Sequence, residues 1–202
     1  LTVLEELRVF GVHEELGQRL CTLLSPPSSK GKGEEPTVDD VFEHVLARVE
    51  HDVGRKVVQR AMEALWASRA GLLRDELMAI AKLKPAQWAE IQNALDESLY
   101  DSGGKINFGH DYLRKAVADR YELTDRKQRR LHRKLAEYFA TLPVTARVAE
   151  ELPWQWEQAE KKEKLKACLT DLEMFAILKE RDEYELLGYW VRLGLDINSE
   201  YD

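Results

Sequence analysis

The sequence predicts a mainly α-helical protein: a winged helix-turn-helix with a small β-hairpin wing, followed by a helical-repeat segment that stacks into a superhelix. Three observations predict this fold class. Apolar residues recur at helical spacing along most of the chain. Pro85 separates two of the predicted helices, and residues 101–104 form one glycine-containing turn between two short strand-like runs.

Composition divides the chain into four segments. Residues 1–24 carry leucines at helical spacing and predict a terminal helix. Residues 25–36 are crowded with proline, glycine and serine, which predicts a flexible linker. We expect the winged helix over residues 37–122 and the helical repeats over residues 123–202.

The first helix of the winged-helix domain is predicted to follow Thr37 and to end at Gly54. Thr37 can cap the helix, and Asp40 can reach back to the N–H of the cap. One apolar stripe repeats at i, i+3, i+4 and i+7: Phe42, Val45, Leu46 and Val49.

Three more helices are predicted over residues 55–69, 72–83 and 85–98. Gly71 interrupts the chain between the first two. Pro85 separates the last two, because proline disfavours helix at the preceding residue and suits a first helical turn. The helix over 85–98 is the candidate recognition helix.

A β-hairpin is predicted directly after these helices. Residues 98–100 and 105–108 form the two short strands, and Gly103 and Gly104 in the turn can adopt positive φ. A short helix, a proline turn, a further helix and then a hairpin is the order typical of a winged helix-turn-helix.

The remainder of the chain predicts helices over residues 111–121, 124–139, 147–159, 163–169, 172–179 and 183–193. Their short lengths favour helix pairs that stack as repeats, although no strict period is present. Four aromatic residues in this part can be either packing residues or anchors of a partner groove: Trp154, Trp156, Tyr189 and Trp190.

The composition, with 44% hydrophobic and 33% charged residues, is typical of a soluble helical protein. The sequence has no membrane-length apolar run and no signal peptide at its start, so we expect a cytoplasmic protein. Because it begins at Leu1 and not at methionine, we interpret it as a piece of a longer protein.

The sequence lacks the patterns of catalytic and metal sites. Cys21 and Cys168 lie far apart in helical patterns, which favours two reduced core thiols. The glycines around Lys32 do not follow a strand, as a phosphate-binding loop requires. We predict no catalytic residue, no metal ligand and no enzyme activity. Four histidines in charged stretches are expected at the surface: His13, His44, His51 and His132.

Charge is distributed unevenly along the chain. The net charge of −7 argues against a dedicated nucleic-acid partner, which needs a basic face. One stretch is nevertheless strongly basic, with Arg126, Lys127, Arg129, Arg130, Arg133 and Lys134. It can be a solvated helix face, a dock for an acidic neighbouring domain, or a phosphate-facing surface.

His110 and Asp111 follow the predicted hairpin and open the next helix. A His-Asp pair in this place resembles the sensor motif of STAND-class signalling NTPases of the NACHT type, nephrocystin-like and telomerase-associated proteins among them. Residues 3–8 resemble the last helix of a NACHT lid, and residues 65–72 resemble the turn before the winged helix. Gly109 departs from the family, which often has methionine at that position.

The resemblance covers roughly residues 1–140 and implies a role for the pair. In that family the histidine contacts the diphosphate of bound ADP, and this role falls here on His110. Asp111 can cap the following helix. The resemblance also implies ADP or ATP with magnesium in an intact parent and no cofactor in the fragment. It implies contacts with other domains of the same chain and with protein partners, and oligomerisation of the activated parent. The pair can also be only a local hydrogen-bonded cap.

Three hypotheses for function follow. The first is a non-catalytic regulatory and protein-interaction fragment of such an NTPase. The second is a winged-helix DNA-binding regulator, against which the candidate recognition helix carries Glu90, Asp96 and Glu97 and no Lys or Arg. The third is a helical scaffold whose partner binding does not depend on nucleotide.

Overall fold

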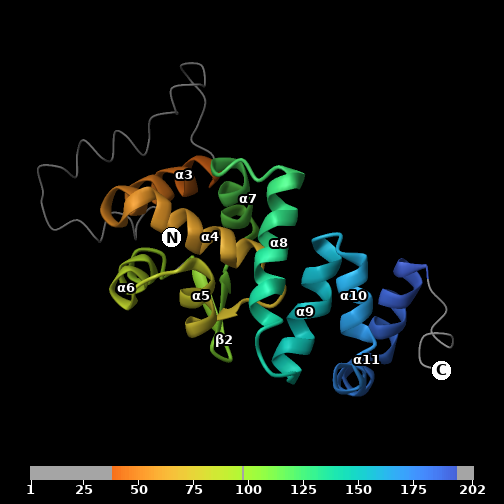
Figure 1. Cartoon of the computed structure of the whole chain (residues 1–202). Helices are drawn as coiled ribbons and strands as arrows, with labels where there is room; N and C mark the ends of the chain where they lie inside the picture. Colours follow the sequence, from red (N-terminus) through yellow and green to blue (C-terminus); the bar gives the residue numbers. More distant parts are fainter. Residues whose placement is uncertain (1–37, 97, 195–202) are drawn as a thin grey trace, which may run out of the picture. The chain divides into compact units, whose positions relative to one another are not determined.

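The computed structural model describes residues 38–96 and 98–194 (Figure 1). The predicted helix over 1–24, the linker over 25–36 and the Thr37 cap lie outside the described residues. The described chain is mainly helical, with a small three-stranded sheet. It forms two compact units, one of residues 38–66 and 71–122, the other of residues 67–70 and 123–194.

The first unit begins with α3 (Val38–Val49), η1 (Glu50–Gly54) and α4 (Arg55–Ala67). The predicted apolar stripe of α3 is buried: Phe42, Val45, Leu46 and Val49. The helical path ends at Gly54 as predicted: η1 is a π-helical turn that continues α3, and Gly54, with φ of +103°, lies directly before the start of α4 at Arg55.

A buried carboxylate lies in the π-helical turn. Glu50 is 8% exposed and accepts hydrogen bonds from Arg120 at 2.9 and 2.7 Å and from the Tyr121 hydroxyl at 2.7 Å. Burial alone would raise the pKa of Glu50, but these hydrogen bonds outweigh it, and the pKa lies below its ordinary value. Glu50 thereby connects η1 to the end of α7 (Asp111–Arg120).

The predicted third helix over 72–83 was wrong at its start. Leu72 and Leu73 form strand β1 (Leu72–Leu73), and α5 (Arg74–Ala81) begins after it. The Glu76 carboxylate accepts the Leu73 N–H at 2.9 Å, which fixes the helix start after Leu73.

Helix α6 (Pro85–Ala94) begins at the predicted proline and buries Trp88 and Ile91. It ends at Ala94 and not at residue 98, so the candidate recognition helix is one turn shorter than predicted.

The predicted hairpin is confirmed, with strands β2 (Leu99–Ser102) and β3 (Lys105–Phe108) pairing antiparallel. Gly103 and Gly104 in the turn have φ of +63° and +82°. The Asp101 carboxylate accepts the Gly104 N–H at 2.7 Å. Strand β3 is central, because β1 pairs with its other edge in the order β1-β3-β2.

The second unit contains α8 (Asp125–Phe139), α9 (Ala146–Gln158), α10 (Lys162–Leu169) and α11 (Leu172–Leu193). These bounds agree with the predicted helices to within a few residues. Each helix packs against the next, and α11 also contacts α9 (Figure 1). The connections between these helices, residues 140–145, 159–161 and 170–171, are short. Short connections are typical of neighbouring helices in bundles and repeats.

Helix α11 contains a bend at Asp182, where φ is −165° and ψ is 99°. The Asp182 carboxylate accepts the N–H groups of Tyr184 at 3.0 Å and Glu185 at 3.1 Å, as an N-cap does. The two helices predicted over 172–179 and 183–193 are therefore both present and meet at this residue.

Candidate functional site

His110 and Asp111, the junction pair, lie between β3 and α7. His110 is the N-cap residue of α7, with extended backbone and an exposed side chain that makes no capping hydrogen bond. Asp111 is the first residue of the helix and not its cap, in the turn where the helix dipole favours a carboxylate. The Gly109 N–H donates to the Ser98 carbonyl at 2.8 Å, which ties this junction to the start of the hairpin.

Arg114, one turn into α7, holds the junction in place. Its guanidinium donates to the Trp66 carbonyl at 2.7 Å and to the Asn107 side-chain oxygen at 3.1 Å. It also lies over the Phe108 ring, 5.3 Å from the centroid. Burial lowers the pKa of Arg114, although nearby Asp111 acts in the opposite direction. Arg114 thus links the first turn of α7 to α4 and β3, while no described residue hydrogen-bonds to the His110 imidazole.

The predicted basic stretch forms one face of α8. Four arginines spaced at i, i+3, i+4 and i+7 line a groove of about 380 Å³ together with the turn between α9 and α10. The residues of this basic groove are Arg126, Arg129, Arg130, Arg133, Ala159, Glu160 and Lys161. Lys127 and Lys134, which the sequence grouped with the arginines, are half-buried and do not line it.

The cations of the basic groove are incompletely neutralised. Arg129 pairs with Glu160 at 2.9 Å, and Arg133 pairs with Glu137 at 3.4 Å, in both cases between largely exposed side chains. Arg126 and Arg130 pair with none of the described residues. The groove therefore presents excess positive charge in a chain whose net charge is −7.

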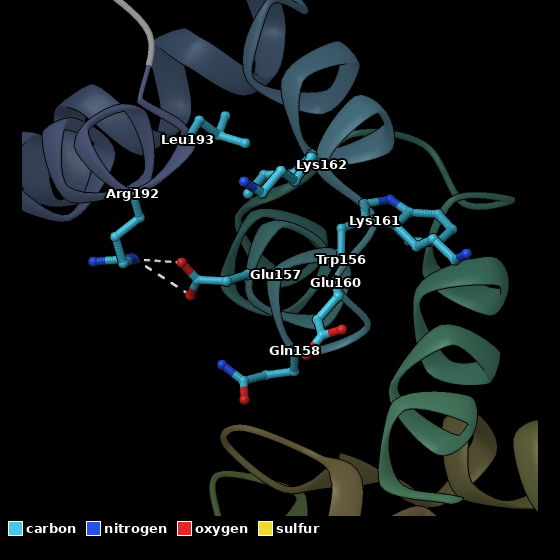
Figure 2. Close-up of a pocket in the computed structure, with 9 residues that line it drawn as sticks. Trp156, Glu157, Gln158, Glu160, Lys161, Lys162, Arg192 and Leu193 are labelled. Atoms are coloured by element: carbon cyan, nitrogen blue, oxygen red, sulfur yellow. Dashed lines mark hydrogen bonds and ion pairs between the residues drawn. The ribbon is translucent and has the colours of Figure 1, made fainter. Parts of the chain in front are cut away.

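An apolar pocket of about 370 Å³ adjoins the same turn (Figure 2). Its residues come from α9, α10, α11 and the turn: Trp156, Glu157, Gln158, Glu160, Lys161, Lys162, Leu165, Arg192 and Leu193. Figure 2 shows Arg192 of α11 facing Glu157 of α9, with which it forms an ion pair. Glu160 and Lys161 line both hollows.

Three of the four aromatic residues singled out in the sequence divide between the two roles left open there, and Trp154 is half-buried and packs edge-on against the His132 ring. Trp190 and Tyr189 are 0% and 1% exposed and are packing residues. Trp156 is 7% exposed and lines the apolar pocket, so it serves the core and can also meet a ligand.

A buried carboxylate organises the core of the second unit. Glu151 is 0% exposed and accepts the backbone N–H groups of Arg69 at 3.2 Å and Ala70 at 3.0 Å. Arg147 donates to it at 3.2 Å, and the Gln155 amide donates at 2.9 Å. Both carboxylate oxygens therefore have donors. Because two of these donors are the N–H groups of Arg69 and Ala70, the bonds join segment 67–70 to this unit.

The prediction that His132 lies at the surface was wrong. Its side chain is 6% exposed, and its Nδ1 lies 2.9 Å from the Gln155 side-chain oxygen. The Gln155 amide also donates to the Ala67 carbonyl at 2.8 Å. Burial lowers the pKa of His132 below its ordinary value, so Nδ1–H donates to Gln155 from a neutral ring at neutral pH. The charged residues that flank His132 in the sequence indicated an exposed position. Its burial has no local signal, because its hydrogen-bond partner Gln155 lies 23 positions away along the chain.

The other sequence candidates are located as follows. Cys168 is a free, half-buried thiol, and burial together with Asp171 raises its pKa to about 12. Cys21 and His13 lie outside the described residues. Within the described ranges, no group of three or more His, Cys, Asp or Glu side chains could hold a metal ion. None of the described helices combines the length and the apolar character that crossing a membrane requires.

Comparisons with known proteins show distant relatives. The chain is 29% identical over 196 residues to a TPR repeat-containing protein of Dictyostelium discoideum. The aligned region covers 93% of this chain and 11% of that protein. It is 29% identical to nephrocystin-3 of Mus musculus over 164 residues and of Homo sapiens over 168 residues. These matches cover 77% of this chain and 12% of each nephrocystin.

The chain thus spans 11–12% of the length of these curated relatives. No protein-family model matches it, and no solved structure matches it. The expected likeness to nephrocystins is present as distant sequence similarity, while the assignment to NACHT-type NTPases stays a prediction.

Proposed function

We propose that this chain is a non-catalytic regulatory and protein-interaction region of a larger STAND-class, NACHT-type signalling NTPase. The first unit is a winged helix that senses ADP bound by a neighbouring core, with magnesium, in the intact protein. The second unit is a helical-repeat segment that contacts other domains and protein partners. Exchange of ADP for ATP would release these contacts and permit oligomerisation.

The exposed imidazole of His110 carries this proposal. It projects from a helix N-cap at the exit of the hairpin, where no described residue satisfies it, and Arg114 fixes the backbone around it. An imidazole in such a position can donate a hydrogen bond to a phosphate oxygen. The first unit also supports the winged-helix assignment, because the order α4, β1, α5, α6, β2, β3 places the hairpin directly after these helices and before α7.

The similarity to a TPR repeat-containing protein and to nephrocystin-3 supports a protein-interaction role for a helical segment. A DNA-binding role is less well supported. Helix α6 carries Glu90 and no Lys or Arg, so its charge has the wrong sign for a phosphate-lined groove.

The substitution His110→Ala in the intact parent tests the sensor role. Loss of one hydrogen bond to a charged phosphate costs about 1.5–3 kcal/mol, which corresponds to ADP release that is faster by a factor of about 10 to 160. The measurements are the nucleotide content of the purified protein and the dissociation rate of a fluorescent ADP. Basal signalling activity is expected to rise.

His51→Ala provides a matched control, because the His51 side chain is 88% exposed and lies in η1, away from the junction pair in sequence. This control should retain ADP as the unsubstituted protein does. Unchanged ADP retention in His110→Ala would contradict the sensor role.

A further inference from the structure

We propose that the basic groove and the apolar pocket together form one docking surface for an acidic peptide segment that carries a large apolar side chain. This inference rests on one part of the proposed function, namely that the second unit contacts protein partners. It names the chemistry of the partner and the residues that recognise it.

The two hollows are adjacent. Glu160 and Lys161 line both of them, so the turn between α9 and α10 is their shared wall. A ligand lying across this turn reaches the arginines of α8 on one side and Trp156 on the other. All contributing elements belong to the second unit.

The basic groove suits a short run of carboxylates. From Arg126 to Arg133 the helix rises about 10 Å, which about three extended peptide residues can span. Arg126 and Arg130 pair with no described residue. The exposed pairs of Arg129 and Arg133 are weak enough to exchange for ligand carboxylates. Guanidinium groups bind carboxylates with two parallel hydrogen bonds, which adds directionality.

The apolar pocket suits one large side chain. Trp156, Leu165 and Leu193 contribute apolar side chains to its lining, and its volume of about 370 Å³ exceeds that of a leucine or phenylalanine side chain. Lys161 and Lys162 add positive charge at the same pocket. An apolar residue beside acidic residues therefore matches both the shape and the charge of the surface.

A nucleic acid matches the surface less well. A phosphate backbone would use the arginines, but it would leave the apolar pocket empty and would meet Glu157 and Glu160. An acidic peptide meets the same carboxylates but offsets them by burying apolar area, at about 25 cal/mol per Å².

Fluorescence anisotropy with the whole 202-residue chain tests the proposal. The probes are glutamate-rich peptides with one phenylalanine before or after the acidic run, and the same peptides with alanine in place of phenylalanine. A glutamine-rich peptide with phenylalanine and an oligothymidylate of equal charge complete the set. We expect the acidic phenylalanine peptide to bind most tightly, and its binding to weaken between about 50 and 200 mM salt.

Two variants separate the two halves of the surface. The double substitution Arg126→Glu with Arg130→Glu should weaken binding of both acidic peptides at least about tenfold, since it reverses two cations that pair with no described residue. Leu193→Ser should weaken only the phenylalanine peptide, by about five- to tenfold. Lys164→Glu, an exposed charge reversal on α10 that lines neither hollow, should leave both affinities unchanged.

Equal binding of the phenylalanine and alanine peptides would overturn the proposal, as would tighter binding of the oligothymidylate or absence of peptide binding at about 100 µM. Circular dichroism confirms that each variant is folded. If peptide binding fails while His110→Ala still releases ADP in the parent, only the docking surface is refuted. The opposite result refutes the nucleotide sensor and leaves the docking surface in place.

Discussion

At the scale of single residues, the second unit depends on buried polar groups whose partners are distant in sequence. Glu151 accepts N–H groups from residues 69 and 70, and Gln155 bonds to Ala67 and His132. Helical spacing identified the apolar residues around them, but a glutamate or histidine within a charged stretch predicts exposure. The sequence therefore could not reveal this network, because nothing local indicates the backbone groups that satisfy it.

His132 makes the stability of the chain depend on pH. Burial, the largest effect, lowers its pKa below the ordinary value of 6.5, although Gln155, Glu151 and the Ala67 backbone act in the opposite direction. The unfolded chain therefore takes up a proton at a higher pH than the folded chain. The contribution of His132 to stability is fully present above about pH 6.5 and is lost as the pH falls below it.

We predict that the free energy of unfolding decreases as the pH falls from about 7 to about 5.5, and that His132→Asn removes part of this decrease. Asparagine keeps an N–H donor near the position of Nδ1 but does not titrate in this range. Urea denaturation followed by circular dichroism at several pH values measures the effect. His51→Asn, at an exposed position, should leave the pH dependence as it is. An unchanged pH dependence in His132→Asn would show that the buried ring does not control it.

At the scale of elements, the sequence predicted the helices and the hairpin because each carries its own signal. The α3 stripe repeats at helical spacing, and Gly103 with Gly104 permits the turn. Strand β1 carries no such signal, because two leucines have neither a helical nor an alternating period. It is a strand because Leu72 pairs with Ile106. The pairing requires a close approach of the chain at Gly71.

Gly71 allows this approach and is expected to be intolerant of substitution. Its φ is +82°, and a Cβ atom there would lie 2.6 Å from the Ile106 carbonyl oxygen. We predict that Gly71→Ala lowers the free energy of unfolding by about 3 kcal/mol, because backbone strain and the clash add. Urea denaturation of the full chain, monitored by circular dichroism, measures the loss.

Gly103→Ala is the matched comparison for this substitution. Its φ of +63° carries strain, but no atom lies within 4 Å of the added Cβ. The expected loss is about 1 kcal/mol. Equal losses for the two substitutions would contradict the close approach of β1 to β3.

At the scale of the whole molecule, the two units do not follow the chain in simple succession. Residues 67–70 lie before most of the first unit in sequence, yet they belong to the second unit. A division into 37–122 and 123–202, which composition favours, separates Glu151 and Gln155 from the backbone groups that they bind. Sequence patterns report local periodicity, whereas membership of a unit is decided by hydrogen bonds between residues about 80 positions apart.

We therefore predict that a fragment of residues 123–202 is much less stable than the same unit within the full chain. The fragment buries Glu151 without the N–H groups of Arg69 and Ala70, and each unsatisfied buried group costs about 1–3 kcal/mol. A loss of this size is a large fraction of the stability of a small domain, which is about 5–15 kcal/mol. Circular dichroism and NMR peak dispersion of the fragment should show helices without fixed tertiary packing.

Glu151→Ala in the full chain tests the same cause without cutting the chain. It removes the acceptor for both backbone N–H groups and for Arg147, and it should destabilise the second unit by about 3 kcal/mol. Glu163→Ala, at an exposed position on α10, should change the stability by less than about 0.5 kcal/mol. A fragment 123–202 that unfolds cooperatively with the stability of the intact unit would show that segment 67–70 is dispensable, and Glu151→Ala should then also be tolerated.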